Sequence, residues 1–143
     1  MSASINAINN QFRDSMPLYI TGITMQLDIL DWENNHNMVL PHTIRDDIIR
    51  RLIERTLRER QICDYLDIEL IPTNNNTFAA YIWTNHWYRN NTTTNHQSQI
   101  MDLGVSYMNN PALDNEQWVV RESEFITRED MYAHANVLTN HRT

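Results

Sequence analysis

The residues able to do chemistry in this chain are one cysteine, six histidines and eighteen carboxylates. Cys63 follows an arginine- and aspartate-rich segment and has no nucleophile signature around it, so we expect a structural thiol rather than a catalytic one. The histidines lack the paired spacing of a zinc site, and the scattered carboxylates indicate no acid–base pair. We therefore expect no enzyme, no catalytic residue, no metal and no cofactor.

The charge of the chain argues against a nucleic-acid partner. Its net charge is −7, whereas a nucleic-acid binder usually needs a basic face to neutralise phosphates. The densest basic run, between Arg45 and Arg60, is interleaved with acidic residues and indicates a solvated helix face. Trp83, Trp87 and Tyr88 are expected to pack rather than to stack on bases. Double-stranded RNA binding is thus the least favoured function.

The chain contains no lysine, because all eleven basic residues are arginines. An even split of the usual charged fraction would give about nine lysines. Lysine alone carries an ε-amine that is acetylated, methylated or ubiquitinated. Its absence suits a protein that works near ubiquitin ligases, and chance is the alternative.

The elements predicted from hydrophobic periodicity indicate one α+β domain. We expect an antiparallel sheet of about four to six strands, one long amphipathic helix packed on a face, and short N- and C-terminal helices. The expected strands are residues 18–30, 38–40, 65–71, 77–88, 101–107 and 118–121. The expected helices are residues 1–15, 43–63 and a closing helix from residue 127, with the domain spanning 1–139 and a flexible tail at 140–143.

Two segments are expected to be loops, and no segment is expected to enter a membrane. Residues 89–99 have no apolar side chain and should form a mobile loop, and residues 109–116 should form another. No signal peptide is evident, and no apolar run approaches the roughly 20 residues that span a bilayer. We expect a cytoplasmic protein.

The end of the long helix carries the most specific motif. Leu57, Gln61 and Tyr65 recur every four residues and are therefore expected to lie on one face of a helix that spans residues 43–65. A partner groove would accept such a row, with Arg60 in its polar rim. The segment resembles the elongin-binding box of the von Hippel–Lindau and SOCS-box families. Thr56 matches the small residue, Leu57 the leucine and Tyr65 the last apolar position, whereas Gln61 replaces the usual cysteine. The resemblance implies elongin B/C as a partner.

A weaker pattern lies at the start of the same helix. Leu40, Pro41, Ile44 and Ile48 resemble the cullin box that such families carry, which implies a cullin as a partner. The pattern precedes the elongin box here, whereas it follows it in the family. A helix start with a nearby proline explains the letters equally well.

The second predicted loop and its flanks offer apolar anchors for a target protein. These are Tyr107, Met108, Pro111, Leu113 and Trp118. The polar 89–99 loop is the alternative target-binding segment.

The whole chain, which is compact, asparagine-rich and lysine-free, is similar to the N-terminal silencing suppressors of cricket-paralysis-type dicistroviruses. That resemblance implies a viral adaptor in the host cytoplasm that binds a host protein such as Argonaute-2 and recruits a cullin–elongin ligase. The alternative is a stoichiometric protein inhibitor that needs no ligase.

Overall fold

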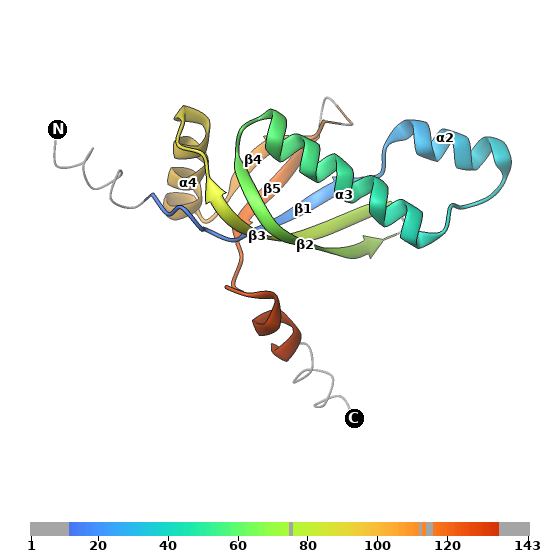
Figure 1. Ribbon diagram of the computed structural model, residues 1–143. Coiled ribbons are helices and arrows are strands. Elements are labelled where there is room, and N and C mark those ends of the chain that lie inside the picture. The colour runs from blue at the N-terminus through green and yellow to red at the C-terminus, as the bar shows by residue number, and fades with distance from the viewer. Residues whose placement is uncertain (1–11, 75, 112, 114–115, 135–143) are drawn as a thin grey trace.

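The computed structural model describes residues 12–74, 76–111, 113 and 116–134 (Figure 1). One antiparallel sheet has the strand order β2-β3-β1-β5-β4. Its strands are β1 (Leu18–Thr24), β2 (Cys63–Asn74), β3 (Thr77–Trp87), β4 (Ser106–Asn109) and β5 (Gln117–Glu122). The helices are α2 (Leu27–His36), α3 (His42–Glu59), α4 (Asn91–Leu103) and a further helical stretch at 128–134. The predicted α+β class and antiparallel sheet are confirmed.

Two crossover connections organise the sheet. β1 and β2 both pair antiparallel with β3, so the β1–α3–β2 connection joins two parallel strands that flank a third. β3 and β5 flank β1 in the same way, and α4 lies in the connection between them. The first connection has the arrangement of a split βαβ unit, whereas the second also contains β4, which pairs with β5 at the edge of the sheet. Figure 1 shows α3 and the 128–134 helix on opposite sides of the sheet.

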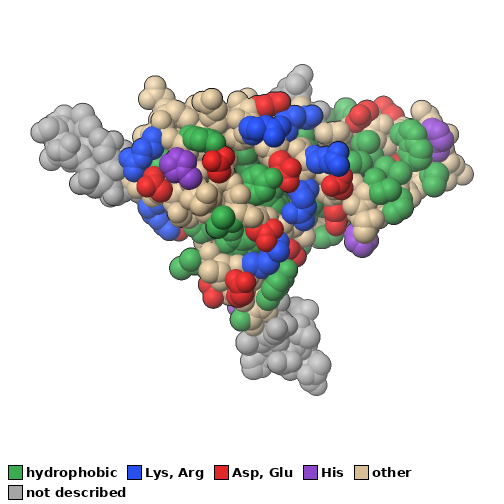
Figure 2. Space-filling view, in the orientation of Figure 1, with side chains coloured by type: hydrophobic (Ala, Val, Ile, Leu, Met, Phe, Trp, Pro, Cys, Tyr) green, Lys and Arg blue, Asp and Glu red, His purple; other side chains and the backbone are tan. Residues whose placement is uncertain are grey.

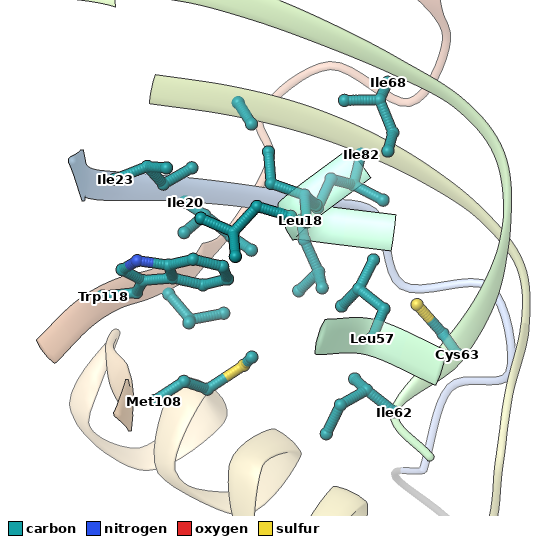
Figure 3. Packing of buried hydrophobic residues seen from close by; sticks show 14 of the residues in the cluster. Leu18, Ile20, Ile23, Leu57, Ile62, Cys63, Ile68, Ile82, Met108 and Trp118 are labelled. Atoms are coloured by element: carbon teal, nitrogen blue, oxygen red, sulfur yellow. The ribbon is translucent and has the colours of Figure 1, made fainter. Parts of the chain in front are cut away.

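The hydrophobic core lies between α3 and the sheet. Leu18 and Ile20 of β1 belong to one buried cluster with the apolar stripe of α3 (Figure 3). The buried apolar residues of α3 are Ile49, Leu52, Ile53 and Leu57. Each such side chain contributes about 1.5–3 kcal/mol when it leaves water, so the stripe holds the helix on the sheet. The predicted helix is thereby confirmed as an element, although it ends at Glu59 rather than at residue 63.

The prediction of a single long helix was incomplete, because α2 and α4 also lie between strands. The strand predicted at 18–30 ends at Thr24, where Met25 N–H donates to the carbonyl of Asn76 at 2.8 Å and the chain leaves the sheet. α2 follows and ends at His36, where Asn37 caps the helix in the left-handed conformation, with a φ of 51°. The strand predicted at 38–40 is absent, since those residues connect α2 to α3.

The segment predicted as a polar loop at 89–99 is mostly the helix α4. Asn90 and Thr93 form a capping box, in which each side chain accepts the backbone N–H of the other. Gln97 is buried, and its amide both accepts from the N–H of Arg13 and donates to the carbonyl of Arg13, each at 2.9 Å. The helix is therefore packed through a polar face whose hydrogen bonds are satisfied.

β2 is an edge strand, and arginines cover the middle of its edge. The carbonyl of Ile68 accepts from Arg50 Nη1 at 2.6 Å and from Arg128 Nη2 at 3.1 Å. An uncovered edge carbonyl is a template for pairing with another strand. The two guanidinium groups occupy that position instead.

The predictions for the ends of the chain fall largely on residues outside the described ones. This holds for most of the helix predicted at 1–15, although residues 12–15 are not helical. The predicted closing helix is observed over residues 128–134, and the tail predicted at 140–143 lies outside the described residues.

Candidate functional site

The helix face predicted to bind elongin is not present. α3 closes after Glu59 because Ile62 N–H donates to the Leu57 carbonyl at 2.9 Å and Gln61 N–H to the Arg58 carbonyl at 3.1 Å. This pair of bonds is the Schellman closure, and it places Gln61 at a φ of 53°. Leu57 and Ile62 both join the core, as the apolar contact of that motif requires. The prediction of one helix through Tyr65 was therefore wrong.

The residues of the elongin-box-like motif are dispersed. Leu57 and Thr56 are buried, with exposed fractions of 0% and 3%, and the Thr56 hydroxyl donates to the Leu52 carbonyl at 2.7 Å. Gln61 is exposed in the turn after the helix, whereas Tyr65 is half-buried in β2. A groove that approaches this end of α3 meets polar side chains such as Gln61, and the leucine anchor is not accessible.

Only some of the side chains predicted to anchor a target protein are exposed. Met108 and Trp118 pair across β4 and β5 and are buried, because alternate residues of a strand face the core. Figure 3 shows both side chains within the core cluster. Tyr107 and Pro111 are exposed, and Leu113 is half-buried. Met108 and Trp118 were thus wrongly predicted as anchors.

Two nucleophilic side chains, those of Cys63 and Ser106, are buried. Cys63 is buried, and burial together with the charge of Asp64 raises the pKa of its thiol to about 12. His96 Nδ1 lies 2.7 Å from Ser106 Oγ, and Ser106 donates to Gln99 at 2.7 Å, but Ser106 is fully buried. Burial, with a smaller contribution from a nearby arginine, lowers the pKa of His96. No substrate reaches that hydroxyl, and no cluster of three metal-binding side chains occurs among the described residues.

The most unusual surface is a helical arm, which we define as α2, the 37–41 connection and the first turn of α3. Of eleven exposed large hydrophobic side chains among the described residues, five lie in this arm. They are Leu27, Trp32, Met38, Val39 and Ile44, with exposed fractions of 53, 38, 51, 70 and 46%. Figure 2 shows hydrophobic side chains gathered over α2 at the end of the molecule. We call these five residues the arm patch.

A buried ion pair joins α2 to the first turn of α3 within the arm. Glu33 is the only buried residue of α2, and its carboxylate accepts from the Leu40 N–H at 2.8 Å and lies 3.2 Å from Arg45 Nε. Arg45 also donates to Asn76 at 3.0 Å, which links the arm to the β2–β3 turn. The side chains of Glu33 and Arg45 are only 7% and 12% exposed. Polar contacts position the arm together with Ile29 and Leu30, which are partly buried against the core, and the five side chains of the arm patch remain on the surface.

The cullin-box-like residues lie at the base of this arm. Pro41 and Ile44 are exposed, Leu40 is half-buried, and Ile48 is half-buried against the core. A hollow of about 600 Å³ adjoins them, lined by residues of α2, the connection and α3 that include Met38, Val39 and Arg45. Ile44 is itself a residue of the arm patch, and Leu40 and Pro41 lie in the same arm. The sequence did not reveal the patch, because residues 27–30 were predicted to continue a strand and not to begin a helix.

None of the helices in the described part of the chain is long and apolar enough to cross a membrane. The candidate site is the arm patch, an apolar surface on an arm that the Glu33–Arg45 ion pair helps to position. Comparisons with protein-family models, curated proteins and solved structures found no match to this chain.

Proposed function

We propose that this protein is a non-catalytic docking protein whose arm patch binds an apolar surface on another protein. The observation that carries the proposal is the concentration of exposed apolar side chains on an arm that buries a single residue of α2. Exposed apolar patches rimmed by polar residues mark interaction sites. Trp32 is the expected central anchor, because tryptophan is enriched among residues that dominate binding energy.

The charges around the patch indicate the character of the partner. Asp28 and Asp31 of α2 are exposed in the arm. Complementary charge across an interface steers association and selects partners. The partner surface should therefore be apolar in its centre and basic at its rim.

Paired substitutions of equal exposure test this function. Val39→Asp places a charge in the arm patch, and Leu103→Asp places the same charge at a site outside it with a similar exposed fraction, 70% against 74%. Proteins that co-purify with the wild type from insect cells are identified and purified, and their affinities are measured by calorimetry. Val39→Asp should weaken binding at least about tenfold, whereas Leu103→Asp should change it less than about twofold. Equal effects of the two variants would exclude the arm as the docking site.

A second, more specific candidate is recruitment of a cullin–elongin ligase. Two observations favour it: the absence of lysine, which spares the chain from side-chain ubiquitination, and the location of Leu40, Pro41 and Ile44 at the arm. In this proposal the arm contacts the ligase. A victim such as Argonaute-2 binds elsewhere, for example at Tyr107 and Pro111, which are exposed. A stoichiometric inhibitor would bind its target in the same way but without a ligase.

Purified ligase components separate these candidates. Ile44→Asp should abolish binding to a cullin–elongin B/C assembly, and Gln61→Ala tests contact with elongin at the end of α3. Leu57→Ala is unsuitable for this purpose, because emptying a fully buried leucine site destabilises the fold by about 2–5 kcal/mol. If wild type binds neither cullin nor elongin B/C, the ligase proposal is wrong and the docking function stands with another partner.

A further inference from the structure

The face of the sheet opposite α3 carries a row of aromatic rings beside two carboxylates. Tyr19 and Tyr81 lie 4.6 Å apart between ring centroids, and Tyr81 and Trp83 lie 6.2 Å apart. In the register of β2 and β3, Asp67 is opposite Trp83 and Glu69 is opposite Tyr81. The sheet thereby places acidic groups along the side of an aromatic surface.

The chain itself seats an arginine on this surface. The Cζ atom of Arg128 lies 5.5 Å from the centroid of Trp83, with ion pairs of 2.6 Å to Asp67 and 2.9 Å to Glu69. Arg128 also donates to the carbonyl of Ile68 at 3.1 Å. An aromatic face, two carboxylates and a carbonyl together match the planar, five-donor guanidinium group. We call these groups of Trp83, Asp67, Glu69 and Ile68 the guanidinium site.

The segment that brings Arg128 to the site lies at the surface of the domain. We call residues 124–134 the strap, and none of its residues is buried. The ion pairs are partly exposed, with side-chain fractions of 29% for Arg128, 43% for Asp67 and 29% for Glu69. Solvent screening at this exposure weakens each pair, and the two pairs depend on the single guanidinium group of Arg128. The remaining described contacts include the Phe125 ring 5.6 Å from Tyr81 and the Tyr132 hydroxyl 3.3 Å from Glu69.

Displacement of the strap would leave a site that needs a cation. Two carboxylates would lose their counter-ion, and their charge repels phosphate, which disfavours a nucleic-acid ligand. The Trp83 indole N–H is buried in a residue only 5% exposed and has no hydrogen-bond acceptor. A peptide supplies both missing groups, since its backbone has carbonyl acceptors and an arginine side chain fits the fork of acids better than lysine does.

We propose that the guanidinium site binds an arginine side chain of a partner protein, and that Arg128 occupies it in cis as a competing internal ligand. The partner is thus a cationic, arginine-bearing segment, as the net charge of −7 also favours. This site lies on the sheet face opposite α3 and is carried by observations independent of the arm.

The test removes the internal ligand and supplies a free one. Acetyl-Gly-Arg-Gly-amide is titrated into wild type and Arg128→Ala, and binding is followed by the indole N–H resonance of Trp83 in heteronuclear NMR. Arg128→Ala should bind the arginine peptide at least about tenfold more tightly than wild type, and about tenfold more tightly than the lysine analogue. Adding Asp67→Asn to Arg128→Ala should remove the binding.

Matched controls keep the proposal falsifiable. Arg121→Ala removes an exposed arginine of β5 outside the site and should bind the peptide no better than wild type. Val39→Asp tests the arm and should leave peptide binding in the Arg128→Ala background unchanged. An Arg128→Ala protein that keeps the wild-type β-sheet spectrum yet ignores the peptide would overturn the inference. So would one that binds arginine and lysine peptides equally or binds only single-stranded RNA. A wild-type dimer that Arg128→Ala abolishes would instead assign the site to a second copy of the chain.

Discussion

α2 is the more apolar of two helices in the domain but buries fewer residues, whereas the more polar α4 buries more. α2 contains Leu27, Ile29, Leu30 and Trp32, yet the only buried residue it contributes is the acid Glu33. α4 is dominated by asparagine, threonine and glutamine, yet it buries Thr93, Gln97 and Ile100. Both helices connect strands of the same sheet, so chain connectivity alone does not explain the difference.

The comparison shows that a polar helix can pack into the domain when its buried polar groups have hydrogen-bond partners. Gln97 is buried because both halves of its amide meet the backbone of Arg13. α2 is held by the Glu33–Arg45 ion pair and by the partly buried Ile29 and Leu30, whereas its Leu27 and Trp32 are left exposed. An element with apolar residues that its own fold leaves exposed is the place to look for a partner.

The largest expected effect concerns the tether of α2. Arg45→Ala leaves the Glu33 carboxylate buried without its cation, which should cost about 3–5 kcal/mol. Urea unfolding measures the total, and hydrogen exchange shows whether the loss is confined to the amides of the arm. Arg51→Ala is the matched control, since its pair with Asp47 is exposed, and it should change stability by less than about 0.5 kcal/mol. Equal losses would mean that the Glu33–Arg45 pair does not hold the arm.

A smaller loss is expected from the buried amide of α4. Gln97→Ala leaves both backbone groups of Arg13 without their partner, which should cost about 1–3 kcal/mol. The measurement is chemical unfolding followed by circular dichroism. Asn95→Ala changes an exposed residue of the same helix and should be nearly neutral. If both variants were neutral, polar packing of α4 would be disproved.

The cap of α4 should contribute about 1 kcal/mol. Asn90→Ala removes the acceptor for the Thr93 N–H and the 2.9 Å bond from the Asn90 amide to the Gln61 carbonyl. Thermal unfolding should show a lower midpoint. Asn90→Asp keeps the capping acceptor and should recover most of the loss, whereas failure of this rescue would indicate that the bond to Gln61 matters more.

The smallest effect is a pH dependence that belongs to α4. Burial lowers the pKa of His96 below its ordinary 6.5, so the unfolded chain takes up this proton more readily than the folded one. His96 should therefore reduce stability as the pH falls below about 6.5, until the lowered pKa of the folded state is passed. Unfolding free energies at pH 7.5 and 5.5 should differ more for wild type than for His96→Gln. The same difference in both proteins would contradict the assignment.

The sequence predicted those elements whose buried sides are apolar. The stripe of α3 and the alternation of β2, β3 and β5 follow directly from side-chain periodicity, so these elements were found close to their observed bounds. α4 was not predicted because its sequence is polar. Polarity alone does not distinguish a loop from a helix that buries a glutamine hydrogen-bonded to Arg13. Its one local signal was the Asn90–Thr93 capping pair.

The candidate site was less predictable than the fold. Gln61 gives no warning of a helix end, because glycine is the usual residue in the left-handed position of a Schellman closure. Met108 and Trp118 face the core because side chains alternate between the two faces of β4 and β5. The sequence did not give the register, and a shift of one residue would exchange the two faces. The arm patch depends on where α2 lies relative to α3, which is a tertiary property.

The two arginines on the Ile68 carbonyl have a consequence for the behaviour of the open strap. Lifting residues 124–134 withdraws Arg128 from the edge of β2, whereas Arg50, which reaches the same oxygen from α3, remains. If both arginines were removed, the open edge of the twelve-residue strand β2 would be available to other copies of the chain. An open strand edge of this kind is the starting geometry for fibrillar self-association. Arg50 would thus let the strap open in a concentrated solution without seeding aggregates.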